Sequence, residues 1–140
     1  MSVGMLLITH GQVGRALVDT AASTLGFCPL DTAVLSITPD SDPDLVDEKA
    51  RYLARQLDGG EGVLVLTDIY GSTPANVACR LLNAHRAAVV TGVNLPMLIR
   101  LFNYPSLSLD ELAQKAVSGG QDGIRCCVEV GGQGAAIKIA

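Results

Sequence analysis

The sequence has few of the features that mark nucleic-acid-binding or membrane-spanning proteins. Aromatic residues make up only 4% of the chain, too few for the stacking platforms that bind single-stranded nucleic acids. The ten lysines and arginines are scattered, and the formal net charge is −4, so no nucleic-acid partner is expected. No apolar run approaches the roughly 18 residues that a membrane-spanning helix needs, and no direct insertion into a membrane is expected.

A secretory signal and a cysteine motif are also missing. The first residues carry no basic segment and the apolar run at residues 5–9 is short, which favours a cytoplasmic location. None of the four cysteines belongs to a CxxC pair, so free thiols are expected, and adjacent Cys126 and Cys127 are interpreted as packing residues. The histidines and cysteines show no ligand spacing, and no metal or organic cofactor is predicted.

What the chain does contain is enough apolar sequence for one folded domain. Its 140 residues are the size of a single domain, and hydrophobic residues make up 49% of them. We assign residues 1–130 to this domain and residues 131–140 to a Gly-rich C-terminal tail.

Short apolar runs alternate with amphipathic helical segments. Asp42 and Thr73 each precede a proline and are predicted N-caps, and Ser108 begins a capping box with Glu111. The segment 118–123 (SGGQDG) is predicted to break the chain after the last helix. The predicted strands are 5–9, 33–37, 62–67, 88–91 and 124–130, and the predicted helices are 13–25, 43–58, 74–84, 96–102 and 109–117.

This alternation predicts an α/β fold with a parallel sheet covered by helices on both faces. Right-handed crossovers favour a doubly wound open sheet with strand order 2-1-3-4. Ligands of such sheets bind at the carboxyl ends of the strands, beside the point where the strand order reverses. In this order that point lies between the first and third strands.

The first and third strands end in residues whose side chains can take part in catalysis. The first ends at Thr9-His10-Gly11 and the third at Thr67-Asp68, so His10 and Asp68 are predicted neighbours. A carboxylate that accepts a hydrogen bond from one ring nitrogen fixes the histidine tautomer and turns the other nitrogen outward. That outward nitrogen can act as a nucleophile or as a base. As alternatives, His10 is a polar surface residue and Asp68 caps a turn.

The segment after Asp68 predicts an anion site. Thr73 and Pro74 begin a helix whose free N–H groups and dipole attract negative charge. Gly71 lets the backbone approach closely, and Ser72 and Thr73 offer hydroxyl donors. A histidine beside such a site suggests phosphoryl transfer through phosphohistidine, although the same residues also fit an ordinary helix start. No Walker motif is present, so no P-loop ATP site is expected.

Three segments together resemble a known family. They are THG at the end of the first strand, TDIYGSTPANVA, and GVNLPML. In this order and spacing they are similar to the mannose-family IIA component of the bacterial phosphoenolpyruvate-dependent phosphotransferase system, and the likeness extends from about residue 5 to residue 130. The sequence departs from the family at Ser72, where glycine or alanine is usual.

The resemblance implies a phosphotransferase that acts through a phosphohistidine intermediate. His10 would accept a phosphoryl group from HPr and pass it to a IIB protein, and Asp68 would hold its imidazole. The sequence contains no fused IIB domain, so a separate IIB protein is expected. The residues that would bind the phosphoryl group are Gly71, Ser72 and Thr73, and those that would line the pocket are Thr9, Gly11 and Asn94.

The family also implies an assembly and a setting. The four-stranded parallel core would be extended by an antiparallel fifth strand, 124–130, exchanged between the subunits of a homodimer. An unpaired edge strand invites such pairing on physical grounds as well. The expected setting is sugar uptake through separate IIB and membrane components.

Three other functions were weighed against this one. The first is a regulatory phosphoprotein of the same relay that is not coupled to sugar transport. The second is the phosphotransferase subunit of dihydroxyacetone kinase, which Ser72-Thr73-Pro74 argues against. The third is a non-catalytic module that binds a small anion in the same pocket.

Overall fold

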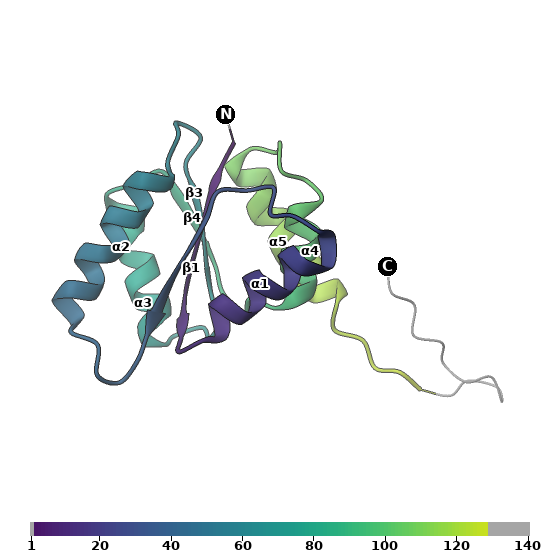
Figure 1. Cartoon of the computed structure of the whole chain (residues 1–140), viewed down its shortest axis with the longest axis horizontal. Helices are drawn as coiled ribbons and strands as arrows, with labels where there is room; N and C mark the ends of the chain where they lie inside the picture. The colour runs from purple at the N-terminus through teal and green to yellow at the C-terminus, as the bar shows by residue number, and fades with distance from the viewer. Residues whose placement is uncertain (1, 129–140) are drawn as a thin grey trace.

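An all-parallel sheet of four strands forms the centre of the computed structural model, which describes residues 2–128 (Figure 1). The strands are β1 (Gly4–His10), β2 (Thr32–Ile37), β3 (Val63–Thr67) and β4 (Ala87–Val90). Their order in the sheet is β2-β1-β3-β4, which confirms the predicted doubly wound topology. β1 and β3 are neighbours, so the point where the strand order reverses lies between their carboxyl ends.

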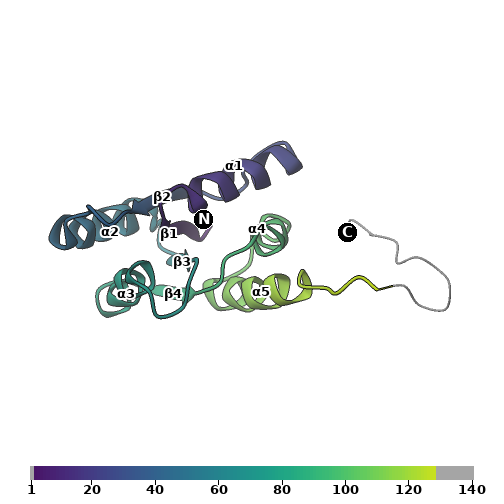
Figure 2. The same ribbon diagram turned by 90° about the horizontal axis from the view of Figure 1, so that it is seen from below.

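Helices cover both faces of this sheet. Figure 2 shows α2 and α3 on one side of the strands and α1, α4 and α5 on the other. The crossover through α1 therefore lies on one face and those through α2 and α3 on the other, as right-handed crossovers require when the strand order reverses once, after β2. The helices are α1 (Val13–Leu25), α2 (Pro43–Leu57), α3 (Thr73–Arg80), the 3₁₀ turn η1 (Leu81–Asn83), α4 (Leu95–Phe102) and α5 (Leu109–Asp122).

The two central strands are buried on both faces, which explains why their sequences are apolar without interruption. Successive side chains point to opposite faces, so each strand contributes side chains to two separate hydrophobic cores. Met5, Leu7, Leu64 and Leu66 pack with α1, α4 and α5, whereas Leu6, Ile8, Val63 and Val65 pack with α2 and α3. This double burial fixes β1 and β3 firmly and so holds their carboxyl ends side by side.

The helix starts follow the predicted capping chemistry at two places and differ at a third. Asp42 accepts a hydrogen bond from the N–H of Asp44, and Ser108 and Glu111 form the predicted capping box. In α3, however, the N-cap is Ser72 rather than Thr73. The carbonyl of Ser72 accepts the N–H of Asn76 at 2.9 Å, which is the first helical bond, so Thr73 already lies in the helix.

The last helix is longer than predicted. The segment 118–123 is not a break, because α5 continues through Gly119 and Gly120 to Asp122. The glycines allow α4 to approach: a Cβ at Gly119 would lie 2.5 Å from Cβ of Arg100. Sequence patterns assign glycine to turns, whereas here close packing of two helices requires it.

Beyond α5 the chain leaves the domain (Figure 1). Residues 124–128 of the predicted fifth strand form no strand within the chain, and residues 129–130 lie outside the described residues. Cys126 and Cys127 are exposed, so their interpretation as packing residues is wrong for the single chain. The two other cysteines, Cys28 and Cys79, are free and exposed as well.

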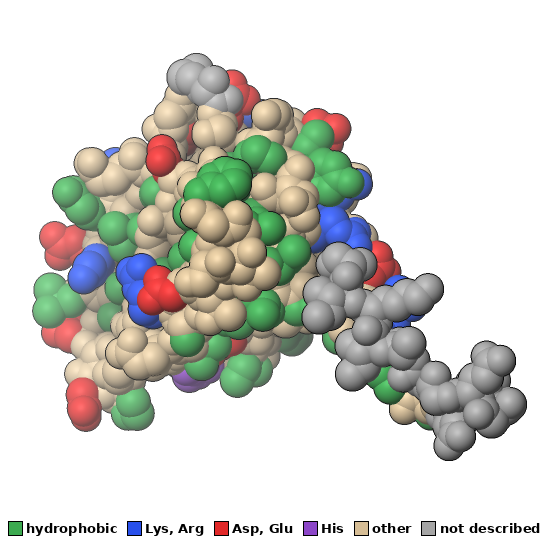
Figure 3. Space-filling view, turned by 45° about the vertical axis from the view of Figure 1, so that its right-hand side comes forward, with side chains coloured by type: hydrophobic (Ala, Val, Ile, Leu, Met, Phe, Trp, Pro, Cys, Tyr) green, Lys and Arg blue, Asp and Glu red, His purple; other side chains and the backbone are tan. Residues whose placement is uncertain are grey.

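The described surface is mixed in character. On the face in Figure 3, charged side chains of both signs are interspersed with hydrophobic ones, and neither sign dominates. Among residues 2–128, no helix has the length and apolar character needed to cross a membrane.

The packing at Gly119 generates a prediction. Gly119→Ala should lower the free energy of unfolding by about 1–3 kcal/mol, because the added methyl overlaps the Arg100 stem and forces α4 and α5 apart. Gly120→Ala is the control and should cost less, since the atom nearest to its methyl would be the flexible end of Met97, at 3.1 Å, and the other neighbours would lie at ordinary contact distances of 3.5 Å and 3.6 Å. Urea unfolding measures both, and equal effects would contradict the packing explanation.

Candidate functional site

The site lies at the carboxyl edge of the sheet, where β1 and β3 end side by side. In the register of these strands Ile8 lies opposite Thr67, so His10 and Asp68 both follow just beyond the paired region. α1 begins after His10 and α3 begins after Asp68, each within a few residues. The edge therefore brings together a histidine, a carboxylate and two helix N-termini.

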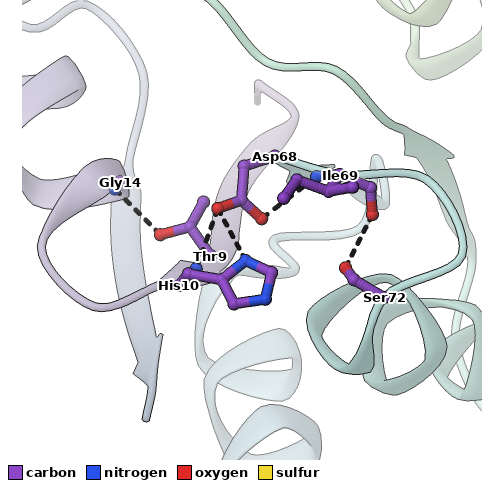
Figure 4. A network of polar contacts seen from close by, with 6 residues as sticks. All are labelled: Thr9, His10, Gly14, Asp68, Ile69 and Ser72. Carbon is purple, nitrogen blue, oxygen red and sulfur yellow. Dashed lines mark hydrogen bonds and ion pairs between the residues drawn. The ribbon is translucent and has the colours of Figure 1, made fainter.

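His10 and Asp68 form a close pair, as the strand order predicted (Figure 4). Nδ1 of the His10 ring lies 2.9 Å from Oδ2 of Asp68. The same oxygen accepts the backbone N–H of His10 at 3.0 Å, and Oδ1 accepts the N–H of Ile69 at 3.1 Å. One carboxylate thus holds both the main chain and the side chain of His10.

The environment of Asp68 determines its charge. Burial acts to raise the pKa of the Asp68 carboxyl, but the hydrogen bonds from the His10 backbone, the His10 ring and the backbone beside Asp68 outweigh it and lower that pKa. Asp68 is therefore ionised at neutral pH and can only accept hydrogen bonds. Nδ1 of His10 must then carry the proton, which leaves the lone pair of the neutral ring on Nε2.

The free nitrogen of His10 is accessible. The His10 side chain is 45% exposed, whereas that of Asp68 is only 11% exposed. In Figure 4 the second ring nitrogen points away from Asp68. The buried partner thus fixes the ring and leaves Nε2 open to a reactant, an arrangement suited to a nucleophile.

A tight turn connects Asp68 to α3. The backbone N–H of Ser72 donates to the carbonyl of Ile69 at 3.4 Å, and the Ser72 hydroxyl donates to that carbonyl at 2.6 Å. Gly71 has φ +76°, a conformation that favours glycine. Thr73, exposed, occupies the first position of the helix. Gly71, Ser72 and Thr73 therefore surround the N-terminus of α3.

The three residues expected to line the pocket have structural contacts as well. Gly11 has φ +45° and donates its N–H to the carbonyl of Ile37 at 2.9 Å, which turns the chain directly after His10. The side chain of Thr9 is fully buried, and its hydroxyl accepts the N–H of Gly14 at 2.8 Å. Asn94 caps α4 through the N–H of Met97 and donates to the carbonyl of Gly120.

Sequence reasoning missed two contributors to this arrangement. The backbone N–H groups that bind Asp68 have no side-chain signature, so only the fold reveals them. Gly14 is the other: a Cβ there would lie 2.6 Å from the Thr9 hydroxyl, so glycine is needed where α1 starts beneath His10. The sequence signal that could have identified Gly14 is a glycine in the first turn of a helix that begins next to the site.

The electrostatics of the edge favour an anion. Neither α1 nor α3 has an acidic residue in its first turn, so no carboxylate competes for the N–H groups at these termini. No group of three or more histidine, cysteine, aspartate or glutamate side chains able to hold a metal ion occurs among residues 2–128. The arrangement fits nucleophilic chemistry on an anionic group.

These features define a doubly wound α/β domain with a histidine–carboxylate pair and two helix N-termini at its switch point. Residues 4–117 match the family described as PTS system fructose IIA component. The chain belongs to this family, the mannose-type IIA components of the phosphotransferase system.

Individual relatives agree with this assignment. The chain is 30% identical over 128 residues to the PTS system mannose-specific EIIAB component of Escherichia coli K12, covering 89% of this chain but only 39% of that protein. The mannose/sorbose specific IIA subunit from Enterococcus faecalis has a TM-score of 0.81 and 26% identity, covering 93% of this chain and 97% of that one. A PTS IIA protein associated with the fucose utilization operon of Streptococcus pneumoniae has a TM-score of 0.73 and 28% identity, with coverage of 90% and 96%.

The lowered pKa of Asp68 generates a prediction about stability. The unfolded chain binds the Asp68 proton at a higher pH than the folded protein does. The ionised carboxylate therefore stabilises the fold fully above its unfolded pKa of about 3.9, and this contribution disappears as the pH falls through the lower folded pKa. Asp68→Asn removes the titration. The difference in unfolding free energy between wild type and variant should be constant above about pH 5 and shrink below about pH 4.

Urea unfolding followed at a series of pH values measures this difference. A difference that stays the same down to the acid limit would show that the Asp68 charge does not support the fold.

Proposed function

We propose that the protein carries a phosphoryl group on Nε2 of His10, accepting it from HPr and passing it to a separate IIB protein. The observation that carries the proposal is the hydrogen bond between Nδ1 of His10 and the largely buried carboxylate of Asp68. It leaves a fixed, half-exposed nucleophilic nitrogen at a site that favours anions. Membership of the IIA family supports the same chemistry.

The transfer itself needs little more than alignment. Nε2 attacks the phosphorus atom, the new P–N bond forms, and the bond to the donor breaks with its electron pair left on the donor nitrogen. The ring then carries a positive charge, and the Asp68 carboxylate stabilises it through Nδ1–H. Transfer to the acceptor reverses these steps, and no metal or organic cofactor is part of the proposal.

The negative charge of the phosphoryl group would meet the starts of α1 and α3. The N–H groups in the first turn of a helix have no partner within the helix and carry partial positive charge. Gly71, Ser72 and Thr73 would bind the phosphoryl oxygens at α3, and the Gly11 turn would support the start of α1. The protein is thus a phosphotransferase that acts through phosphohistidine.

The relatives support the proposed partners. The E. coli relative is described as a mannose-specific EIIAB component, and this chain spans 39% of its length. We propose that a separate IIB protein accepts the phosphoryl group and that the chain works in a sugar phosphotransferase system of the cytoplasm; membership of the IIA family supports this relay. The names of the relatives mention mannose, sorbose and a fucose utilization operon. We propose that sugar specificity lies in other components of the system.

We further propose a homodimer in which residues 124–130 add a strand to the partner. β4 is an edge strand, and only β3 pairs with it in the described chain. Val89 and Val90 of β4 border an open groove together with Val117 of α5, which is 44% exposed. Ile124, 75% exposed, lies at the start of a segment that leaves the domain (Figure 1). An apolar segment paired along β4 would bury these side chains.

The phosphoryl carrier proposal is tested by intact-protein mass after incubation with phosphoenolpyruvate, enzyme I and HPr. Wild type should gain one acid-labile phosphoryl group, and His10→Ala should gain none. Asp68→Asn should keep the site but lower the initial rate by about 10²-fold, because the ring loses its fixed orientation and its counter-charge.

A gain of mass in His10→Ala would assign the chemistry to another residue. No gain in wild type, with both phosphocarriers shown to be active, would instead favour the non-catalytic anion-binding module.

The dimer is tested by light scattering during size-exclusion chromatography. Ile124→Asp should convert the dimer into a monomer, because a charge would be buried against the partner. Leu45→Asp on α2 is the matched control, since Leu45 is 62% exposed and outside the proposed interface. A monomeric wild type, or a variant that remains dimeric, would contradict the proposed strand exchange.

A further inference from the structure

Tyr70 stands out on the surface beside the candidate site. It is 85% exposed, the highest value among the large hydrophobic side chains of residues 2–128, and its neighbour Ile69 is 57% exposed. Both directly follow Asp68 in the chain. Exposed aromatic and aliphatic side chains next to a reactive group mark a surface that a partner covers.

The backbone holds Tyr70 outward. Tyr70 and Gly71 are the central residues of the turn from Ile69 to Ser72, which is closed by the 2.6 Å bond from the Ser72 hydroxyl to the Ile69 carbonyl. Positive φ at Gly71 fits the third position of a type II turn. Figure 4 shows Ile69 and Ser72 of this turn beside the His10–Asp68 pair. An aromatic residue on a closed turn loses little conformational freedom on binding, which favours affinity.

The proposed phosphoryl transfer indicates which partner covers the surface formed by Ile69 and Tyr70. A phosphoryl group carried by a protein reaches Nε2 of His10 only if the donor surface lies over the exposed rim of the ring. That rim includes the Ile69–Ser72 turn on one side and the start of α1 on the other, where Val13 is 43% exposed. From residue 67 to residue 74 the only charged side chain is Asp68, which His10 already binds. The turn can therefore contribute apolar contact rather than an ion pair.

We propose that Tyr70 is the docking anchor for the protein phosphoryl donor, whose apolar surface around its own phosphohistidine packs on the Tyr70 ring. The inference rests on the proposed phosphoryl transfer to His10. Tyr70 touches neither the P–N bond that breaks in the donor nor the one that forms at His10. It is a positioning residue and not a catalytic one, so it should affect recognition of a protein donor and not the chemistry at Nε2.

Two donors separate these roles. Full-length wild type, Tyr70→Ala and Tyr70→Phe are phosphorylated either by phospho-HPr or by phosphoramidate, a small molecule that needs no protein docking. Tyr52→Ala is the matched control, because Tyr52 is also exposed, at 52%, but lies in the second half of α2, which runs away from the carboxyl edge.

Tyr70→Ala should raise the KM for phospho-HPr about 10- to 30-fold, as expected when an aromatic anchor is removed, and leave the phosphoramidate rate unchanged. Tyr70→Phe and Tyr52→Ala should behave as wild type with both donors. An unchanged KM in Tyr70→Ala, or an equal loss with both donors, would overturn the docking role. Failure of wild type with both donors would instead overturn the proposed function itself.

Discussion

The site depends on one carboxylate that binds two parts of the same residue. Asp68 accepts both the backbone N–H and the ring N–H of His10 through a single oxygen. The backbone bond ties the end of β1 to the end of β3, and the ring bond sets the tautomer and the direction of Nε2. Asp68 therefore has a structural role and a chemical role at once. Both hydrogen bonds from His10 contribute to its lowered pKa.

This pair exists because of the sheet beneath it. β1 and β3 are buried on both faces, so their relative register is fixed by side chains on two independent cores. A slip by one residue would turn apolar side chains to the wrong core and would separate His10 from Asp68. The long sequence distance between the two residues is thus bridged by the packing of strands that have no part in the chemistry.

The same packing explains how much of the molecule could be predicted from sequence. Unbroken apolar strands and alternating helices are local patterns, and together with crossover handedness they led to the strand order and to the His10–Asp68 pair. Tertiary contacts escaped this reasoning. The sequence pattern predicts a break at Gly119 and Gly120, because the reason for these glycines, the close approach of α4, lies elsewhere in the chain. The sequence also predicts packing for Cys126 and Cys127, although nothing among residues 2–128 buries them.

The shift of the α3 N-cap from Thr73 to Ser72 has the same kind of cause. Sequence favours Thr73 because it precedes proline, but the helix start is determined by the turn that brings the chain away from Asp68. Ser72 closes that turn with its hydroxyl and does not cap the helix through its side chain. The Ser72 side chain thus adds a bond that fixes the turn beside His10.

Under the proposed function the protein must also release the phosphoryl group that it accepts, and the composition of the site fits this requirement. Within residues 2–128, the hydrogen bonds and ion pairs of His10 and Asp68 involve no lysine or arginine. Under the proposed function, the phosphoryl charge would be met by helix N-termini, each equivalent to about half a unit charge, rather than by a full cation. Such a site would stabilise the phosphoryl group during its transfer without binding the phosphorylated state too tightly for release. Under the same function, the binding strength between the proteins would come from the partner surfaces rather than from the phosphoryl group.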